Sequence, residues 1–245
     1  MRIAELFAPT DRVVLLHAHP DDETLSTGAL ILALRAAGNP VAVVTATRGE
    51  QGEPTPAFAA LTPASFVAQR ECELRRALDD LGVTERAWLG TPPARAAGRA
   101  PRRYLDSGMR WVTPTLAGPS AEAEPLALAL ASPDEAAADL ATFVESFGAD
   151  VLISYDELGG YGHPDHVACH RIAAAVSGVR FVQVASPGRH SEPGAVVVDE
   201  PEVAGRWRLA LADYPSQFEL LGDQVRHVGG QLQELSTATV LILGE

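Results

Sequence analysis

The sequence predicts an α/β protein with a Rossmann-like, mostly parallel sheet, helices on both faces, and an active site at the carboxyl ends of the strands. Three observations lead to this fold class: short apolar runs alternate with longer helical segments, capping residues mark helix ends, and polar clusters follow directly after two of the apolar runs. Uninterrupted apolar strands are typical of parallel sheets that are covered on both faces. Alternation of such strands with helices is typical of βαβ architectures.

The strands are predicted where short apolar runs stop at polar or glycine-containing residues. The runs "RVVLLHA", "PVAVVTAT" and "ADVLISY" have the length of buried strands, and "RAWLG" is a shorter example. Two further runs, "RFVQVAS" and "GAVVVD", extend the pattern toward the C-terminus. The predicted strands are residues 12–18, 40–47, 86–90, 149–155, 180–186 and 194–199.

The helices are predicted from periodicity and from end signals. Phe66, Leu74, Leu78 and Leu81 recur at roughly helical spacing within one segment. Gly38 ends the first helix, and a serine, a proline and early acids open the segment that begins at residue 132. The predicted helices are residues 23–37, 63–82, 132–148, 163–178 and 202–214.

Residues 91–133 are predicted to be irregular, because Pro, Gly, Arg and Ala dominate the segment and no period holds. A long loop of this kind in a compact domain is often functional, so we expect it on the substrate side of the site. We find no repeat, low-complexity linker or boundary. Residues 1–245 are therefore predicted to form a single domain.

Composition limits the partners. The net charge of −13 would repel a polyanion, so we expect no nucleic-acid partner. The arginines between Arg95 and Arg110 fit either a solvated loop or a binding patch. No apolar run is long enough to span a membrane, and the N-terminal residues lack the core of a signal peptide. We expect a cytoplasmic protein without membrane insertion. The sequence does not determine the oligomeric state, and a homo-oligomer is one of the possibilities.

Two His-Pro-Asp elements stand where a predicted strand passes into a helix. They are His19-Pro20-Asp21-Asp22 and His163-Pro164-Asp165-His166. Proline keeps the preceding residue extended and suits the first helical turn. Ligands of open parallel sheets bind beyond the carboxyl ends of the strands, so both elements should meet at one rim. Imidazole and carboxylate without thiolate form the ligand set of a catalytic zinc site, which keeps one position open for water.

Each element also has a plain structural interpretation. Asp22 or Glu23 could serve the helix N-terminus, where the dipole favours acids, and His166 could be a surface histidine. Two such elements at equivalent places in one α/β pattern favour the metal site over these alternatives. A nicotinamide dehydrogenase is rejected, because His-Pro-Asp-Asp follows the first strand in place of the glycine-rich phosphate turn.

The stretches "AHPDDE" (18–23) and "GHPDH" (162–166) resemble the PIG-L/LmbE-type family of zinc-dependent N-deacetylases, which act on N-acetylglucosamine conjugates. Supporting stretches are "TATRGEQGE" (45–53), "RECEL" (70–74) and "ALADYPSQ" (210–217). "RYLDSGM" (103–109) also resembles the mycothiol-pathway branch, whose members deacetylate N-acetylglucosaminyl-inositol or cleave mycothiol conjugates. Tyr214 stands where that branch tends to have a histidine.

The resemblance implies one zinc ion per chain, held by His19, Asp22 and His166, although such a ligand set also accepts Fe²⁺ or another divalent ion. Asp21 is then free to act as the general base toward a water that the metal acidifies. The Tyr161 hydroxyl is assigned to stabilising the oxyanion.

His163 is expected to be a protonated partner that stabilises charge or helps protonate the departing amine. Asp165 either orients His163 or caps the helix. For substrate binding we favour Arg70, Asp106 and Glu50, because a guanidinium and carboxylates can grip pairs of hydroxyl groups.

The function predicted in this way is removal of acetate from an N-acetylglucosaminyl conjugate, such as N-acetylglucosaminyl-inositol. The alternatives are an amidase that cleaves a larger, mycothiol-type conjugate, a deacylase of a natural-product glycoside, and a non-catalytic sugar-binding protein. The last would need a broken site, whereas all the expected ligands and the base are present in this sequence.

Overall fold

The computed structural model describes residues 2–120 and 123–244. Its largest element is a seven-stranded sheet in the order β3-β2-β1-β6-β7-β12-β8. The strands from β3 to β7 run parallel to one another, and β12 pairs antiparallel with both β7 and β8. This confirms the predicted mostly parallel sheet. The sheet consists of β1 (Val13–His17), β2 (Val41–Thr45), β3 (Glu85–Trp88), β6 (Val151–Tyr155), β7 (Arg180–Val184), β8 (Ala195–Asp199) and β12 (Ala238–Leu243).

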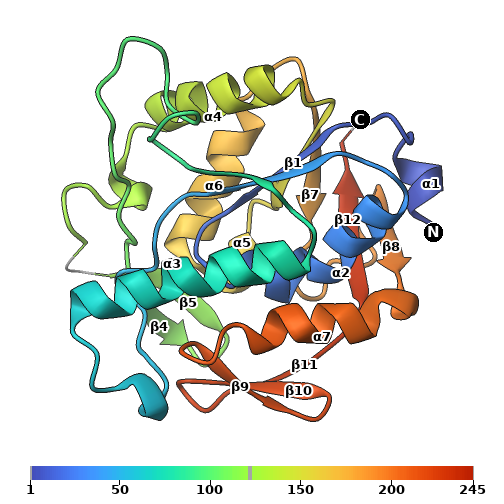
Figure 1. Cartoon of the computed structure of the whole chain (residues 1–245). Coiled ribbons are helices and arrows are strands. Elements are labelled where there is room, and N and C mark those ends of the chain that lie inside the picture. Colours follow the sequence, from blue (N-terminus) through green and yellow to red (C-terminus); the bar gives the residue numbers. More distant parts are fainter. Residues whose placement is uncertain (1, 121–122, 245) are drawn as a thin grey trace.

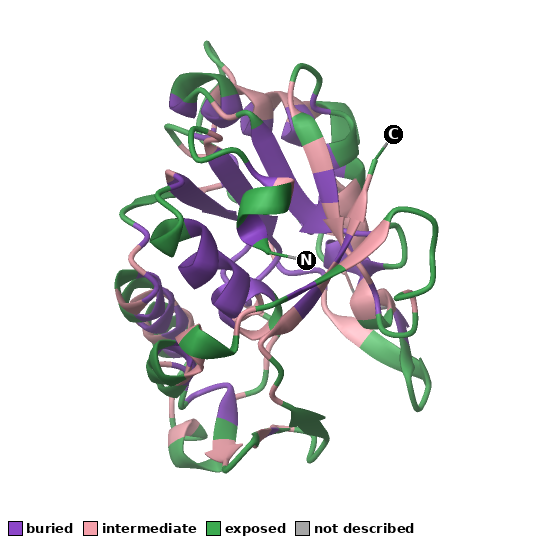
Figure 2. Ribbon diagram, turned by 90° about the vertical axis from the view of Figure 1, so that its right-hand side faces the viewer, coloured by how far each residue is buried: buried purple, intermediate pink, exposed green. Residues whose placement is uncertain are grey.

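Helices cover both faces of this sheet (Figure 1). Apolar side chains of α2, α3 and α7 form one buried cluster with the sheet, and those of α4 and α6 form another on the opposite face. All residues of β1, β2 and β6 are buried between these layers, as the inner strands of Figure 2 show. The helices are α1 (Ile3–Leu6), α2 (Asp22–Ala36), α3 (Pro63–Asp80), α4 (Pro133–Phe147), α5 (Gly159–Gly162), α6 (Pro164–Ala174) and α7 (Ala204–Ala212).

The helix ends follow the expected capping rules. Thr62 and Ser132 accept hydrogen bonds from the backbone N–H groups three residues later, and a proline follows each of them. Gly148 ends α4 in the left-handed conformation that glycine adopts without strain. Among the described residues, no helix has both the length and the apolar character needed to cross a membrane.

The segment predicted to be irregular contains a β-hairpin, so that prediction was wrong in part. Strands β4 (Met109–Thr113) and β5 (Leu116–Pro119) pair antiparallel, with a register shift between Trp111 and Thr113. The shift interrupts the alternation of side chains from which a strand is recognised. Residues 121 and 122 of this segment, like residues 1 and 245 of the predicted domain, lie outside the described residues.

Before the hairpin, the segment is held against α4 by ion pairs. Arg95, Arg99 and Arg102 all contact Glu135, and Arg95 also contacts Asp139, whose carboxylate accepts the Tyr104 hydroxyl. The basic cluster therefore neutralises acids of this chain, which favours the loop interpretation over a binding patch.

After α7 the chain forms a small sheet that the sequence analysis did not predict. It consists of β9 (Phe218–Leu221), β10 (Gln224–His227) and β11 (Leu232–Glu234), in the order β11-β10-β9. Figure 1 shows this sheet at the same end of the molecule as the β4–β5 hairpin. Single turns of 3-10 helix occur at Pro56–Phe58, Leu128–Leu130 and Pro201–Val203.

Candidate metal centre and active site

The two His-Pro-Asp elements meet where the strand order of the sheet reverses. From β1 the chain proceeds to β2 and β3 on one side, whereas β6 lies on the other side of β1 and leads on to β7. Such a switch point opens a crevice beyond the carboxyl ends of the two central strands. His19 follows β1, and His163 and His166 follow β6, so the topology brings them to this crevice as predicted.

The turn between β1 and α2 contains an unusual backbone conformation. Asp21 has a φ of 114°, and it is the only non-glycine residue with positive φ in the described part of the chain. A side-chain-bearing residue adopts this conformation only where its surroundings hold it. The turn places Asp22 at the first position of α2, and its Oδ2 accepts a hydrogen bond from the backbone N–H of His19 at 2.9 Å.

His19 lies between carboxylates on both edges of its ring. Its Nδ1 is 3.1 Å from Asp22 Oδ2, and its Nε2 is 3.1 Å from Asp165 Oδ2 and 3.6 Å from Asp106 Oδ1. A metal-binding histidine characteristically donates its second ring N–H to a carboxylate, which fixes the tautomer. Donation from Nε2 to Asp165 leaves the lone pair of Nδ1 directed to the side of Asp22.

His166 presents a second ring nitrogen to the same carboxylate oxygen. Its Nε2 is buried, lies 3.2 Å from Asp22 Oδ2, and has no hydrogen-bond partner among the described residues. The ring stacks on Tyr155 with centroids 4.2 Å apart and an interplanar angle of 13°. Tyr155 is fixed in turn, because its hydroxyl oxygen accepts the backbone N–H of Ala18 at 3.1 Å.

These distances fit a divalent metal. In a tetrahedral zinc site with bonds of 2.0–2.1 Å, two ligand atoms lie about 3.3 Å apart. Asp22 Oδ2 is 3.1 Å from His19 Nδ1 and 3.2 Å from His166 Nε2. Among the described residues, two groups have donor atoms that all lie within 4.8 Å of one another, and neither includes Asp22: one is His19, His163 and His166, and the other is His19, Asp106, His163 and Asp165. The described residues therefore offer a set of donors that could hold a metal ion.

The charges around the site favour a cation there. Burial disfavours a charged imidazole, yet Asp106, Asp165 and Asp22 together raise the pKa of His19 well above its ordinary value. Burial likewise opposes ionisation of Asp22, but His166 and His19 hold the pKa of that carboxyl well below its usual range. The carboxylates thus make positive charge at this point favourable, which a bound metal would supply.

Asp21 is held beside the metal-ligand set by Arg70 and Glu23. Arg70 donates from Nη2 to the Pro20 carbonyl at 2.6 Å and to Asp21 Oδ2 at 3.2 Å, and from Nη1 to the Gly49 carbonyl at 2.9 Å. Glu23 Oε2 accepts the backbone N–H of Asp21 at 3.1 Å. Burial raises the pKa of Asp21 to about 8, with Arg70 opposing the shift and Asp22 adding to it.

Arg70 was predicted to bind substrate, but the structure gives it an internal role. Its side chain is 4% exposed, and its three hydrogen bonds join the Asp21 turn to the turn at Gly49. Helix α3 directs the Arg70 side chain inward, under the two turns.

Replacing Arg70 by methionine is expected to lower the free energy of unfolding by about 3 kcal/mol, because two buried carbonyls and Asp21 lose their charged partner. Urea unfolding followed by circular dichroism measures the change. Arg75→Met, on the exposed side of the same helix, is the matched control and should change stability by no more than about 0.5 kcal/mol. Equal losses in the two variants would contradict the internal role of Arg70.

Glu50 and Asp106, the other predicted substrate ligands, connect two loops at the rim. Glu50 accepts the backbone N–H groups of Arg48 and Asp106 through Oε2, and Arg103 through Oε1. Asp106 accepts the N–H groups of Gly108 and Gln51. Asp106 is the nearer of the two to the imidazole cluster, through its contact with His19.

The Asp165 carboxylate takes neither of the two roles expected for it, orienting His163 or capping the helix. That carboxylate contacts His19 and accepts both the backbone N–H of Ser107, at 2.9 Å, and the Ser107 hydroxyl. His163 caps α6 instead, and its Nδ1 accepts the backbone N–H of Asp165 at 3.2 Å. The start of α6 directs the Asp165 carboxylate toward His19, which follows β1.

The cap also bears on the charge of His163. A ring nitrogen that accepts a backbone N–H carries no proton, so the remaining ring proton lies on Nε2. Burial, together with His19 and His166, lowers the pKa of His163 well below its ordinary value. The structure thus favours a neutral imidazole that donates from Nε2 over the protonated partner that was predicted.

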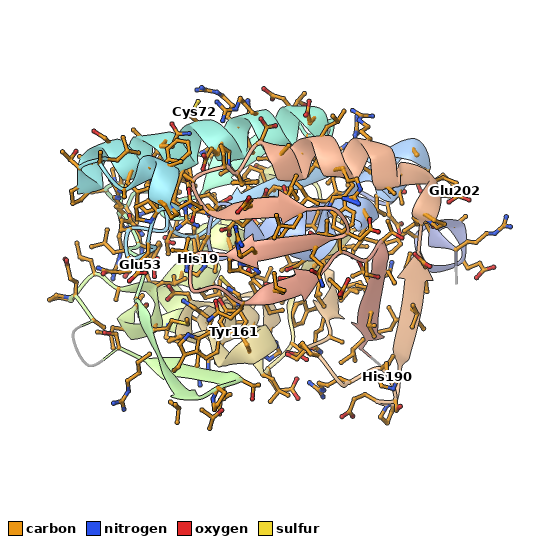
Figure 3. The ribbon with its side chains drawn as sticks, turned by 90° about the horizontal axis from the view of Figure 1, so that it is seen from below. His19, Glu53, Cys72, Tyr161, His190 and Glu202 are labelled. Carbon is orange, nitrogen blue, oxygen red and sulfur yellow. The ribbon has the colours of Figure 1, made fainter. Side chains whose placement is uncertain are left out.

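Tyr161 lies at the open side of the cluster. Its ring is 5.5 Å from that of His166 and 6.0 Å from that of His163, and the side chain is 39% exposed. Figure 3 shows Tyr161 and His19 on the face of the molecule that is seen from below. Among the described residues its hydroxyl has no hydrogen-bond partner, which leaves it available to a ligand.

Some residues of the site escaped the sequence analysis. Ser107 fixes Asp165, Tyr155 supports His166, and Glu23 holds Asp21. Tyr214 donates to Glu23 at 2.5 Å and so belongs to the layer beneath the site. Ser107 and Glu23 lie within the quoted stretches "RYLDSGM" and "AHPDDE", but nothing in their spacing indicates these contacts.

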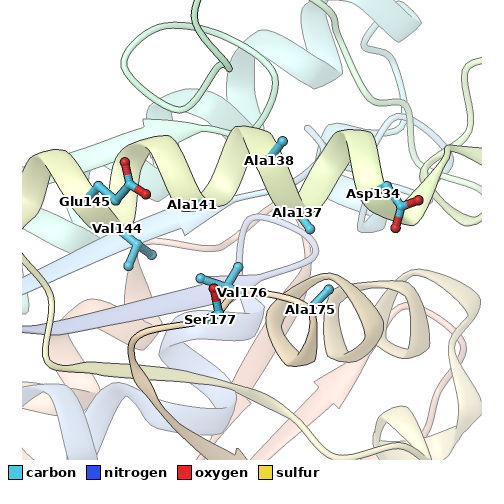
Figure 4. A pocket seen from close by; sticks show the side chains of 9 residues that line it. All are labelled: Asp134, Ala137, Ala138, Ala141, Val144, Glu145, Ala175, Val176 and Ser177. Atoms are coloured by element: carbon cyan, nitrogen blue, oxygen red, sulfur yellow. The ribbon is translucent and has the colours of Figure 1, made fainter.

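A separate cavity of about 230 Å³ lies between α4 and the end of α6 (Figure 4). Residues of α4 line most of it, namely Asp134, Ala137, Ala138, Ala141, Val144 and Glu145, and Ala175, Val176 and Ser177 complete the lining. It contains no imidazole and lies apart from the strand ends, so it is not the candidate site.

Comparisons with known proteins agree with this geometry. The family model for PIG-L, described as GlcNAc-PI de-N-acetylase, matches residues 14–177. The chain is 38% identical over 186 residues to 1D-myo-inositol 2-acetamido-2-deoxy-alpha-D-glucopyranoside deacetylase of Kineococcus radiotolerans, covering 76% of this chain and 48% of that protein. The protein of the same name in Actinosynnema mirum is 38% identical over 216 residues, covering 86% of this chain and 69% of its own.

The chain therefore spans about half of the Kineococcus radiotolerans protein and little more than two thirds of the other. Among solved structures, the N,N'-diacetylchitobiose deacetylase of Pyrococcus horikoshii has a similar fold. Its TM-score is 0.60 at 19% identity, covering 85% of this chain and 71% of that one.

Proposed function

Because the chain belongs to the PIG-L family, we propose that it is a metal-dependent hydrolase that removes the acetyl group from an N-acetylglucosaminyl conjugate. The curated relatives are named for an acetamido-glucosyl inositol, which makes N-acetylglucosaminyl-inositol the first substrate to test. One observation carries the proposal: an ionised Asp22 oxygen lies within 3.2 Å of two imidazole nitrogens, and the carboxyl group of Asp21 is next to them in the chain.

We propose that His19, Asp22 and His166 hold the metal and that the ion is zinc, one per chain. The unpartnered Nε2 of His166 and the carboxylate-bound Nε2 of His19 support this ligand set. Fe²⁺ also suits imidazole and carboxylate ligands. A bound metal of this kind polarises the acetyl carbonyl and acidifies water at neutral pH.

The chain's own residues then move the proton. In its ionised form, which the positive charge of a metal beside it would favour against the effect of burial, Asp21 accepts a proton from the attacking water. It returns the proton to the amine nitrogen as the amide bond breaks, which releases acetate and a free amine. Arg70 and Glu23 keep Asp21 in its strained turn, so the base does not need to be ordered when substrate arrives.

His163 and Tyr161 are proposed to act on the carbonyl oxygen. The Nε2–H of a neutral His163 and the hydroxyl of Tyr161 are donors on two rings whose centroids lie 6.0 Å apart, and donors that are in place before the reaction stabilise the developing oxyanion. Asp106 is proposed to bind a sugar hydroxyl at the rim, and Asp165 to orient His19.

The test is acetate release from N-acetylglucosaminyl-inositol by metal-stripped protein, before and after one equivalent of zinc. We expect release to depend on zinc and to be absent with Mg²⁺ alone, since Mg²⁺ prefers an all-oxygen, octahedral set of ligands. Zinc binding without acetate release would contradict this substrate. Equal release with and without zinc would contradict the metal-dependent mechanism.

A further inference from the structure

The β4–β5 hairpin forms one wall of the candidate site. It begins three residues after Asp106, which contacts His19, and two after Ser107, which contacts Asp165. Its second strand packs on α5: a Cβ added at Gly162 would lie 2.7 Å from the Leu116 side chain and 3.0 Å from the Ala117 carbonyl. The hairpin is therefore seated next to Tyr161.

The Trp111 side chain reaches α5, and its partner on the other strand of the hairpin is the buried Ala117. The Trp111 and Tyr161 rings are 5.6 Å apart and inclined by 32°. The centroid of the Tyr161 ring also lies 5.5 Å from that of His166 and 6.0 Å from that of His163, so Tyr161 lies between Trp111 and the imidazole cluster.

Both rings keep open faces. Trp111 is 45% exposed and Tyr161 is 39% exposed, although tryptophan is on average a highly buried residue. Among the described residues, ten large apolar side chains are exposed, and four of them belong to the hairpin or to the α5 turn without counting Val112 on the other face of the hairpin: Trp111, Leu116, Leu158 and Tyr161. Apolar surface concentrated beside a polar site is typical of a ligand-binding area.

We propose that Trp111 and Tyr161 form a stacking subsite for an aromatic aglycone, the group attached to the anomeric carbon of the amino sugar. The inference rests on the proposed function. In this arrangement the acetamido group binds at the proposed metal ligands and the sugar ring lies beside Tyr161. The aglycone then contacts Trp111, which lies on the far side of Tyr161 from the imidazole cluster. An exposed indole offers a flat apolar face on which an aromatic ring can stack in an offset or edge-to-face arrangement.

The test compares the phenyl and methyl glycosides of N-acetylglucosamine, which share the same acetamide. We expect zinc-loaded protein to have a kcat/KM about tenfold higher for the phenyl glycoside, the size of one good aromatic stacking contact. Trp111→Ala should bring the ratio of the two values close to one. Val112→Ala, which removes the neighbouring exposed side chain on the other face of the hairpin, should leave the ratio unchanged.

Two results would overturn the subsite. One is a phenyl-to-methyl ratio near one in the unmodified protein. The other is a ratio that Trp111→Ala and Val112→Ala lower equally, since this would point to a general effect on the hairpin. Either result leaves acetate release, and hence the proposed function, standing.

Calorimetric measurement of phenyl glycoside binding tests the subsite in the case where the protein hydrolyses no glycoside. If no glycoside is hydrolysed but the phenyl glycoside binds and Trp111→Ala weakens binding about tenfold, the subsite stands and the deacetylase function falls. If the phenyl glycoside is not hydrolysed and does not bind, both the deacetylase function and the stacking subsite are contradicted.

Discussion

Asp21→Asn is expected to lower kcat for acetate release by between about 10² and 10⁴, the range for loss of a general base, while zinc content stays at one ion per chain. The amide keeps the shape of the side chain but does not accept the proton of water. Asp21 is not among the proposed ligands, and its backbone contact to Glu23 does not involve the altered group. Acetate release and metal content, measured on the same preparation, check both parts.

The control is Asp134→Asn, which makes the same chemical change at an exposed position in the first turn of α4. It should retain full activity. An Asp21→Asn protein with bound zinc and undiminished kcat would remove Asp21 from the mechanism. A protein that had lost its zinc as well would instead indicate that Asp21 is a ligand.

His166→Ala is expected to weaken zinc binding by more than about 100-fold, the upper range for loss of a supporting residue around a metal, and to abolish acetate release at equimolar zinc. The substitution removes the buried nitrogen that lies 3.2 Å from Asp22 Oδ2. Competition with a chelator of known affinity gives the binding constant, and excess zinc should restore part of the activity.

His190→Ala provides the comparison, because His190 is exposed on the loop between β7 and β8, away from the cluster. Zinc affinity should not change in this variant. If His166→Ala bound zinc as tightly as the unmodified protein, the ion would have to be held by the other set of donors, from His19, Asp106, His163 and Asp165.

The elements predicted from local pattern agree with the structure where the pattern is complete. The strand predicted at 12–18 is β1 (Val13–His17), and the helix predicted at 132–148 is α4 (Pro133–Phe147). Both have signals that lie within the element itself, an apolar run in one and capping residues in the other. The sequence analysis failed at the hairpin, where Trp111 and Val112 are apolar but exposed and the register shifts between Trp111 and Thr113.

The C-terminal sheet was missed although one signal for it exists. Gly222 and Asp223 separate β9 from β10, and Gly-Asp between two short runs of strand-forming residues is typical of a two-residue hairpin turn. The flanking runs are only four residues long and mix charged with apolar side chains, so the period-2 pattern is weak.

What the sequence determined by itself is the alternation of strands and helices and the two His-Pro-Asp elements at strand ends. Those features are local, and the topology of an open parallel sheet then brings the strand ends together. Only the tertiary structure decided which side chains touch: Asp165 contacts His19 across 146 residues, and Arg70 contacts Asp21 across 49. It also decided that Trp111 lies against Tyr161. Such contacts depend on the direction of each side chain in the packed layers, and sequence spacing carries no information about that direction.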